Sequence, residues 1–235
     1  MEMVLQDIKG KATEGIKMLA VLIDPEKFDR QSTKEFLRKI PAITTHIFIG
    51  GSTATAEELQ SCVVSVKAET GLPVVLFPGD HQQISAAADA LLFLSLLSGR
   101  NPEYLIGQQL RSVPVIRSTQ LEVIPTAYLL IDGGKVCAVQ KVSGTKPLCQ
   151  NEPQVIVDTA LAGKFSGKQL IYLEAGSGAI NPVAPGIIKA VKEATGLPVV
   201  VGGGIKNTHQ LEAAYKAGAA MVVIGTAFEN GSFFL

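Results

Sequence analysis

The chain of 235 residues has no tryptophan, only three cysteines and no excess of charge of either sign. The cysteines, Cys62, Cys137 and Cys149, show none of the paired spacings of a zinc or redox site. Their odd number is typical of reduced thiols in the cytoplasm, which is the predicted location. Because 21 basic side chains balance 21 acidic ones, a broad nucleic-acid-binding surface is not expected.

Long apolar runs are missing as well. The segment ALLFLSLL at 90–97 is far too short to span a bilayer, so no transmembrane segment is expected. The first residues, MEMVLQDIKGK, include acidic side chains and no long apolar stretch, and they do not predict a signal peptide. Apolar residues nevertheless make up 47% of the chain, enough for a full core. The sequence therefore predicts one globular α/β domain over 1–235.

Short apolar runs alternate with helical patterns along the whole chain. The expected strands are 18–24, 46–52, 72–79, 90–98, 123–132, 169–176, 197–203 and 221–226. The expected helices are 28–40, 55–71, 101–113, 154–167, 183–195 and 207–217. A glycine pair at 133–134 is predicted to turn the chain into a hairpin extension over 135–142. Eight such units favour a parallel (β/α)8 TIM barrel, with an open doubly wound sheet as the alternative.

An internal repeat favours the barrel over the open sheet. The segment AETGLPVVLFPG at 68–79 matches EATGLPVVVGGG at 193–204, and at the same spacing IGGS (49–52) falls on EAGS (174–177). Duplication of a half-barrel explains both matches. The next connection is shorter in the first half, because only DHQQISAAA (80–88) precedes the following strand. A reduced third helix is therefore predicted, leaving either a plain short loop or a side opening for a long apolar ligand.

Glycine is concentrated where the predicted strands end. In TIM barrels the loops after strands seven and eight commonly bind phosphate through backbone N–H groups. Gly203 and Gly204 follow strand seven, Gly225 and Thr226 follow strand eight, and Ser177–Gly178 could close a third side. These loops predict a phosphate site, although glycines at strand ends also serve tight turns.

Three polar side chains stand out near the same strand ends. Asp24 and Ser52 follow the first two strands, and their hard oxygen atoms suit Mg²⁺ together with phosphate oxygens. Asp24 could equally cap the turn at Pro25. Glu174, with Tyr172 and Ser177 nearby, could accept hydrogen bonds from a substrate hydroxyl or act as a base. The alternative for Glu174 is an ion pair inside the barrel.

The order of motifs resembles one family over nearly the whole chain. The motifs are LIDPEK (22–27), FIGGS (48–52), FPG (77–79), NPEYLIGQQ (101–109), PTAYLLIDGG (125–134), YLEAGSGA (172–179), VGGGI (201–205) and IGTAFE (224–229). They resemble geranylgeranylglyceryl phosphate synthases and the related heptaprenylglyceryl phosphate synthases. Members of this family are modified TIM barrels that join the C3 hydroxyl of sn-glycerol 1-phosphate to C1 of a prenyl diphosphate and release pyrophosphate.

The resemblance implies a role for each matching position. Asp24 and Ser52 match the Mg²⁺ positions. The glycerol 1-phosphate segment matches Tyr172, Leu173, Glu174, Ala175, Gly176, Ser177 and Gly178, with Glu174 and Tyr172 expected to act in catalysis. The phosphate cup matches Gly203, Gly204, Gly225 and Thr226. Relatives are dimers or hexamers, so a homo-oligomer is expected.

One departure bears on the substrate. One branch of the family has a lysine two residues before the metal-binding aspartate, whereas this chain has Leu22. It therefore resembles the second branch more closely, and geranylgeranyl diphosphate (C20) is the expected prenyl donor. The alternatives are a longer prenyl diphosphate, another phosphate-binding barrel enzyme acting on a sugar phosphate, or a barrel that binds a phosphorylated ligand without catalysis.

Overall fold

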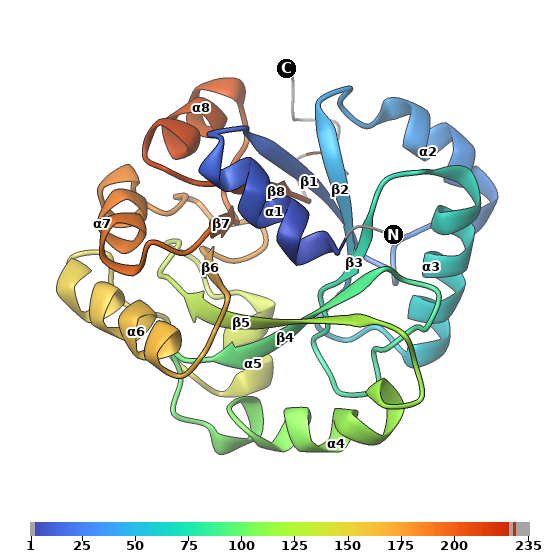
Figure 1. Ribbon diagram of the computed structural model, residues 1–235, viewed down its shortest axis with the longest axis horizontal. Coiled ribbons are helices and arrows are strands. Elements are labelled where there is room, and N and C mark those ends of the chain that lie inside the picture. The colour runs from blue at the N-terminus through green and yellow to red at the C-terminus, as the bar shows by residue number, and fades with distance from the viewer. Residues whose placement is uncertain (1–2, 226–227, 229–235) are drawn as a thin grey trace.

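Eight parallel strands close into a barrel in chain order (Figure 1). The computed structural model describes residues 3–225 and residue 228. The strands are β1 (Met18–Ile23), β2 (Thr44–Ile49), β3 (Val74–Leu76), β4 (Ala90–Leu96), β5 (Glu122–Leu130), β6 (Leu170–Glu174), β7 (Val199–Gly202) and β8 (Met221–Ile224). β1 pairs with β8, which closes the sheet. The TIM-barrel prediction is confirmed, and the open sheet is excluded.

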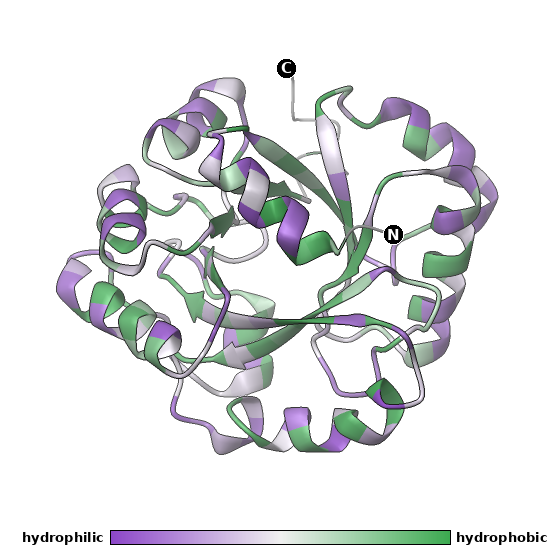
Figure 2. Ribbon diagram, viewed as in Figure 1, coloured by the Kyte–Doolittle hydropathy of each residue, from purple (hydrophilic) through white to green (hydrophobic). Residues whose placement is uncertain are grey.

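Helices surround this barrel and carry hydrophilic and hydrophobic residues in alternation, while the strands are mostly hydrophobic (Figure 2). They are α1 (Val4–Thr13), α2 (Thr33–Lys39), α3 (Ala56–Glu69), α4 (Gly107–Ile116), α5 (Ala138–Ser143), α6 (Pro153–Phe165), α7 (Pro185–Thr195) and α8 (Thr208–Lys216), with short 3-10 turns η1 (Arg30–Ser32) and η2 (Pro102–Tyr104). Among the described residues, none of the helices is long and apolar enough to cross a membrane.

Alternating strand residues divide the core into two layers. Phe48, Tyr172 and Val200 point into the barrel, whereas Ile47 and Ile171 pack outward against the helices. Both layers are almost free of water, since these side chains are nearly fully buried. Burial on both faces explains why the strands read as continuous apolar runs.

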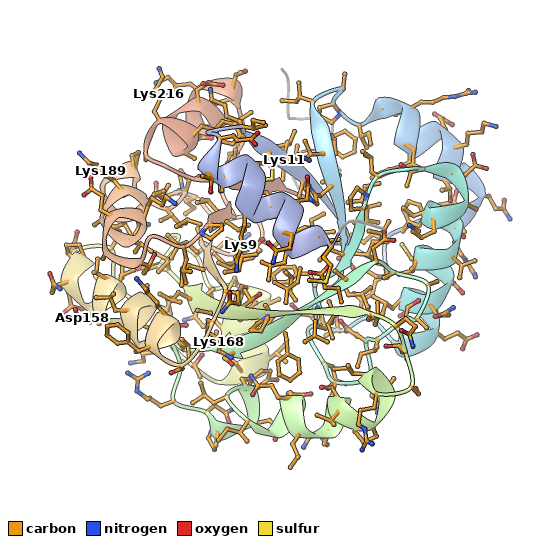
Figure 3. All side chains as sticks on the ribbon, in the orientation of Figure 1. Lys9, Lys11, Asp158, Lys168, Lys189 and Lys216 are labelled. Carbon is orange, nitrogen blue, oxygen red and sulfur yellow. The ribbon has the colours of Figure 1, made fainter. Side chains whose placement is uncertain are left out.

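Helix α1, which the sequence analysis did not predict, covers the amino-terminal end of the barrel. Its buried residues Val4, Leu5 and Ile8 pack against the inward-pointing layer. The Glu122 carboxylate accepts a hydrogen bond from the Leu5 N–H at 3.0 Å, which satisfies a free donor at the start of the helix. Figure 3 shows Lys9 and Lys11 on this helix. With this end closed, a ligand can enter the barrel only from the carboxyl ends of the strands.

Two expectations for the connections had different outcomes. The hairpin extension over 135–142 is wrong, because the chain forms helix α5 there, with Val139 and Val142 facing a cavity. Those two residues are three apart, which is helical spacing rather than strand alternation. The reduced third helix is confirmed: residues 77–89 join β3 to β4 without any helix.

The internal repeat is real, but strand pairing shifts part of its alignment by one residue. Val75 and Val200, which match in the sequence repeat, both point inward. Val75 pairs with Phe48, and Val200 pairs with Tyr172, so Phe48 corresponds to Tyr172. The position equivalent to Glu174 is therefore Gly50, not Ile49 as the match of IGGS with EAGS indicated.

Candidate active site

A cavity of about 530 Å³ opens at the carboxyl ends of the strands. Glycine turns after β7 and β8 line one side. Apolar side chains from β4 and α5, together with polar side chains of α4, line the other. This volume lies in the range of small-molecule sites. The cavity thus combines a polar, backbone-rich side with a long apolar side, and a ligand of mixed character fits it best.

The turn after β7 forms the polar side. Gly203 and Gly204 have φ angles of 80° and 72°, a region that glycine adopts readily and other residues rarely adopt. A Cβ at Gly203 would lie 2.5 Å from Glu174 Oε1, and one at Gly204 would lie 2.8 Å from the nitrogen of Pro182. Only glycine therefore fits, and the bare backbone can approach an anion closely. Ser177, Gly178 and Gly225 line the same side, whereas the prediction for Thr226 lies outside the described residues.

Glu174 ends β6 at the boundary between the two sides, and only 7% of it is exposed. Burial raises the pKa of its carboxyl group to about 7, while the N–H of Gly176 and the Tyr172 hydroxyl oppose that rise. The Gly176 N–H donates to Oε1 at 2.7 Å. A carboxyl group with a pKa near neutrality can exchange a proton with a substrate hydroxyl, which is the requirement for a general base.

Three aromatic rings pack together beside Glu174. Tyr172 stacks on Phe77 with ring centroids 4.9 Å apart, and Tyr128 meets both rings edge-on. The buried Tyr172 hydroxyl faces the Glu174 carboxylate, but its geometry falls short of a hydrogen bond, so it lacks a partner within the described structure. A buried hydroxyl without a partner is costly, and a polar ligand atom in the cavity would satisfy it.

The two predicted metal-site residues lie at the ends of the neighbouring strands β1 and β2. Asp24 and Ser52 both line the cavity, and a Cβ at Gly51 would lie 2.8 Å from Asp24 Oδ1. Lys27 Nζ contacts Asp24 Oδ2 at 2.7 Å. No cluster of three acidic, histidine or cysteine side chains suited to a metal occurs among the described residues. A hard cation here would therefore also need oxygen atoms from substrate and water, as Mg²⁺ commonly does.

The structure separates the residues predicted on β6. Tyr172 and Glu174 point into the barrel and line the cavity, as do Ser177 and Gly178. Leu173 and Ala175 belong to the outward-facing layer and do not line the cavity. Gly176 does not line the cavity either, and it contributes through the hydrogen bond from its N–H to Glu174. Strand alternation could have identified this division from the sequence.

Sequence reasoning missed several cavity residues. Lys27 and Lys206 add positive charge at the rim, and Phe77, Tyr104 and Tyr128 supply aromatic surface. A signal was present for Lys206, which follows the glycine motif directly, and for Tyr128, which is an inward position of a predicted strand. No local pattern identified Tyr104, because it reaches the cavity from η2 through tertiary packing.

The comparisons with known proteins agree with this geometry. The model of the PcrB family matches residues 14–232. The chain belongs to the PcrB family. It is 58% identical over 217 residues to a geranylgeranylglyceryl phosphate synthase of Zunongwangia profunda, covering 92% of this chain and 93% of that relative. A synthase of the same name from Thermococcus kodakarensis is 42% identical, with 91% and 85% of the two chains covered. The predicted resemblance is thus confirmed.

A solved structure of a PcrB relative carries a ligand that bears on the polar side. The crystal structure of (S)-3-O-geranylgeranylglyceryl phosphate synthase from Thermoplasma acidophilum was determined with its substrate sn-glycerol-1-phosphate. It superimposes on this chain with a TM-score of 0.89 at 33% identity, covering 97% of this chain and 92% of that one. That relative therefore shares the whole barrel with this chain.

Proposed function

We propose that this chain is a Mg²⁺-dependent prenyltransferase that joins sn-glycerol 1-phosphate to geranylgeranyl diphosphate. The observation that carries the proposal is the position of Glu174, a buried carboxylate between the glycine turn and the apolar part of the cavity. A phosphorylated alcohol on the glycine side would place its hydroxyl near Glu174. A prenyl chain on the other side would place its first carbon within reach of that hydroxyl.

The reaction follows from these positions. The C3 hydroxyl oxygen of glycerol 1-phosphate attacks C1 of the prenyl diphosphate, the new C–O ether bond forms, and the bond from C1 to the diphosphate oxygen breaks. The hydroxyl proton passes to the Glu174 carboxylate, and pyrophosphate leaves with the bonding electrons. Holding both substrates in one cavity converts an encounter in solution into a reaction between positioned groups.

The polar side chains at the ends of β1 and β2 would hold the metal. Asp24 and Ser52 offer a carboxylate and a hydroxyl, the hard donors that Mg²⁺ prefers. When bound, Mg²⁺ would neutralise charge on the departing pyrophosphate. Asp24→Asn should raise the Mg²⁺ concentration needed for half-maximal activity and lower the maximal rate. Glycerol 1-phosphate binding, measured by calorimetry, should stay unchanged. A variant that keeps the wild-type Mg²⁺ titration would contradict the assignment of Asp24.

The expected C20 donor is supported by Tyr104. This side chain lines the cavity, and its hydroxyl donates to the carbonyl oxygen of Val142 at 3.2 Å, so it bridges η2 and α5. A bridge of this kind closes that side of the cavity to a longer tail. Tyr104→Ala should therefore raise activity with heptaprenyl diphosphate relative to geranylgeranyl diphosphate. Tyr104→Phe, which keeps the ring but loses the hydrogen bond to Val142, should shift the preference less than Tyr104→Ala.

A transfer assay tests the function directly. Radiolabelled glycerol 1-phosphate of each enantiomer would be incubated with Mg²⁺ and prenyl diphosphates from farnesyl to heptaprenyl. An organic-extractable product from the sn-1 enantiomer alone, with the highest rate for geranylgeranyl, is expected. A higher rate with a longer tail would overturn the C20 assignment. Turnover of sugar phosphates with no prenyl transfer would overturn the whole proposal.

A homo-oligomer in the cytoplasm is part of the same proposal. Ile106, Leu110 and Val113 form an exposed apolar row beside and along α4, and Leu110 is 70% exposed. Rows of this kind commonly pack against a second copy. The cysteines of the described chain are unpaired, in keeping with a reducing compartment. Light scattering should give a mass above that of one chain, and Leu110→Glu should lower it.

A further inference from the structure

The connection between β3 and β4 reaches across the cavity wall to α4. We propose that His81 and Gln108 form a clasp that holds the prenyl tail in place, and this inference rests on the proposed prenyl substrate. Both side chains line the cavity, His81 from the connection that replaces the third helix and Gln108 from the first turn of α4. Neither residue was identified from the sequence.

The clasp consists of two hydrogen bonds to one oxygen atom. Gln108 Oε1 accepts from the backbone N–H of His81 at 2.8 Å and lies 3.0 Å from His81 Nδ1. Asp80 Oδ1 lies 3.1 Å from the same ring nitrogen. Because both neighbours of Nδ1 are acceptors, Nδ1 carries the proton and donates it. The histidine ring is thereby fixed against α4.

The other end of the connection is anchored next to the predicted metal site. Gln83, only 1% exposed, donates to the carbonyl oxygen of Ala54 at 2.7 Å and accepts from the Gly79 N–H at 2.8 Å. A Cβ at Gly79 would lie 2.6 Å from the carbonyl oxygen of Gly51, so the two loops are in close contact. The connection therefore links the diphosphate end of the cavity to α4.

The outer side of β4 forms an apolar surface beneath this connection. Leu91 and Phe93 line the cavity, and Ile84 of the connection packs in the same apolar cluster. On α4, Gln109 donates to the carbonyl oxygen of Leu94 at 2.7 Å, so the helix is fixed to β4 next to the clasp. A prenyl chain in this part of the cavity would lie between β4 and the clasp. Loss of the clasp should free the β3–β4 connection from α4 and loosen one side of the space between β4 and the clasp.

Tail length supplies the test, because the proposed clasp should matter most for a tail long enough to lie along β4. Gln108→Ala removes both hydrogen bonds and should raise KM for geranylgeranyl diphosphate about tenfold, in line with the loss of one or two hydrogen bonds. His81→Ala keeps the backbone donor and should have a smaller effect. KM for geranyl diphosphate and for glycerol 1-phosphate should stay unchanged. Gln82→Ala, an exposed position on the same connection, is the matched control.

Binding without turnover separates the clasp from the reaction. Calorimetry with geranylgeranyl thiolodiphosphate, in which sulfur replaces the bridging oxygen, should show weaker binding to the Gln108→Ala variant than to wild type. The double variant His81→Ala/Gln108→Ala should resemble Gln108→Ala, because the two side chains act through one contact. If wild type binds and transfers geranylgeranyl while Gln108→Ala matches Gln82→Ala, the clasp is wrong and the function stands. If wild type neither binds the analogue nor transfers any prenyl group, both proposals fall.

Discussion

The two halves of the internal repeat share a scaffold and differ where their strands end. In the first half β2, α3 and β3 follow one another, and in the second half β6, α7 and β7 do the same. The inward positions Phe48 and Tyr172 correspond, as do Val75 and Val200. Beyond the strands Gly79 still matches Gly204, but other positions differ. Gly50 stands at the position of the Glu174 carboxylate, and Pro78 stands at the position of Gly203.

These differences divide the chemistry between the halves. The second half offers a buried carboxylate and a backbone turn with positive φ angles, which suit a hydroxyl and a phosphate. The first half offers the Phe77 ring, the Ser52 hydroxyl and a connection without a helix, which suit a tail and its diphosphate. In the proposed function, a repeated pair of strands would thus support two different sites, because the residues just beyond the strands differ.

The largest expected effect comes from removing the carboxylate that has no counterpart in the first half. Glu174→Gln keeps the shape and the acceptor for the Gly176 N–H but cannot take a proton. We expect kcat to fall roughly 10³-fold, within the range for general bases. Rapid-quench single-turnover kinetics would measure the chemical step. A loss smaller than tenfold would show that the hydroxyl proton leaves by another route.

The pH dependence of the same step has a defined sign. Glu174 accepts a proton only when ionised, so kcat should rise with pH and level off above the pKa of about 7. The Tyr172 hydroxyl favours the charged form, so Tyr172→Phe should move the midpoint to higher pH. A midpoint near the ordinary glutamate value would mean that the carboxylate is solvated in the working enzyme.

The barrel could be predicted from the sequence because buried parallel strands leave a strong local signal. The runs ending at Asp24, Glu174 and Gly202 are apolar, and glycines follow the last two within two residues. The same locality explains the errors. Helix α1 buries three apolar side chains, and only the end of the barrel beneath them explains why this segment is a helix.

The site was predicted only as far as single loops could reveal it. The sequence predicts Glu174, Asp24 and the glycine turn as site residues because each is a polar residue or a glycine at the end of an apolar run. The His81–Gln108 contact joins residues 27 apart in the sequence, and the contact of Tyr104 with Val142 of α5 joins residues 38 apart. The repeat alignment placed Ile49 against Glu174 because matching letters outweighed the inward and outward alternation.

The second comparison sets His46 on β2 against Leu170 on β6, which occupy equivalent inward positions. His46 is fully buried, and its Nε2 has no hydrogen-bond partner in the described structure. Burial first, and then the charge of Lys11, lowers its pKa from 6.5 to about 4, and Asp7 opposes this. Between pH 6.5 and 4 His46 is therefore protonated in the unfolded chain and neutral in the native state. The free energy of unfolding falls as the pH decreases through that range.

A variant that copies the second half isolates this effect. Relative to His46→Leu, the wild type should lose about 3 kcal/mol of unfolding free energy between pH 6.5 and 4, at 1.36 kcal/mol per pKa unit. Urea unfolding of both proteins across that range measures the difference, in which the opposite contribution of Glu174 cancels. Parallel curves would mean that the native histidine is protonated or reached by water.

The third comparison sets Gly203 against Pro78. Gly203 needs a φ of 80°, whereas proline is held near −65°, so the two loops cannot interchange. Gly203→Ala would strain the backbone and press on Glu174 and Gly176. We expect KM for glycerol 1-phosphate to rise roughly tenfold or more, since such strain costs on the order of 1–3 kcal/mol. Pro78→Ala should leave that KM unchanged. An equal rise for both variants would contradict the proposal that the turn at Gly203 binds the phosphate.

The smallest effect concerns the helix ends that precede β3 and β7. Gly196 follows α7 with a φ of 67°, a left-handed cap, whereas Gly71 lies beyond Thr70, the extended residue that ends α3. No atom beyond the chain neighbours would contact a Cβ at either glycine, so only backbone conformation separates them. Gly196→Ala should lower the unfolding free energy by about 1 kcal/mol, because a left-handed conformation disfavours alanine. Gly71→Ala should be neutral or slightly stabilising, since alanine restricts the unfolded chain. Thermal unfolding of the two variants side by side would measure the difference. Equal losses of stability would mean that Gly71 and Gly196 have the same backbone conformation, which would contradict this comparison.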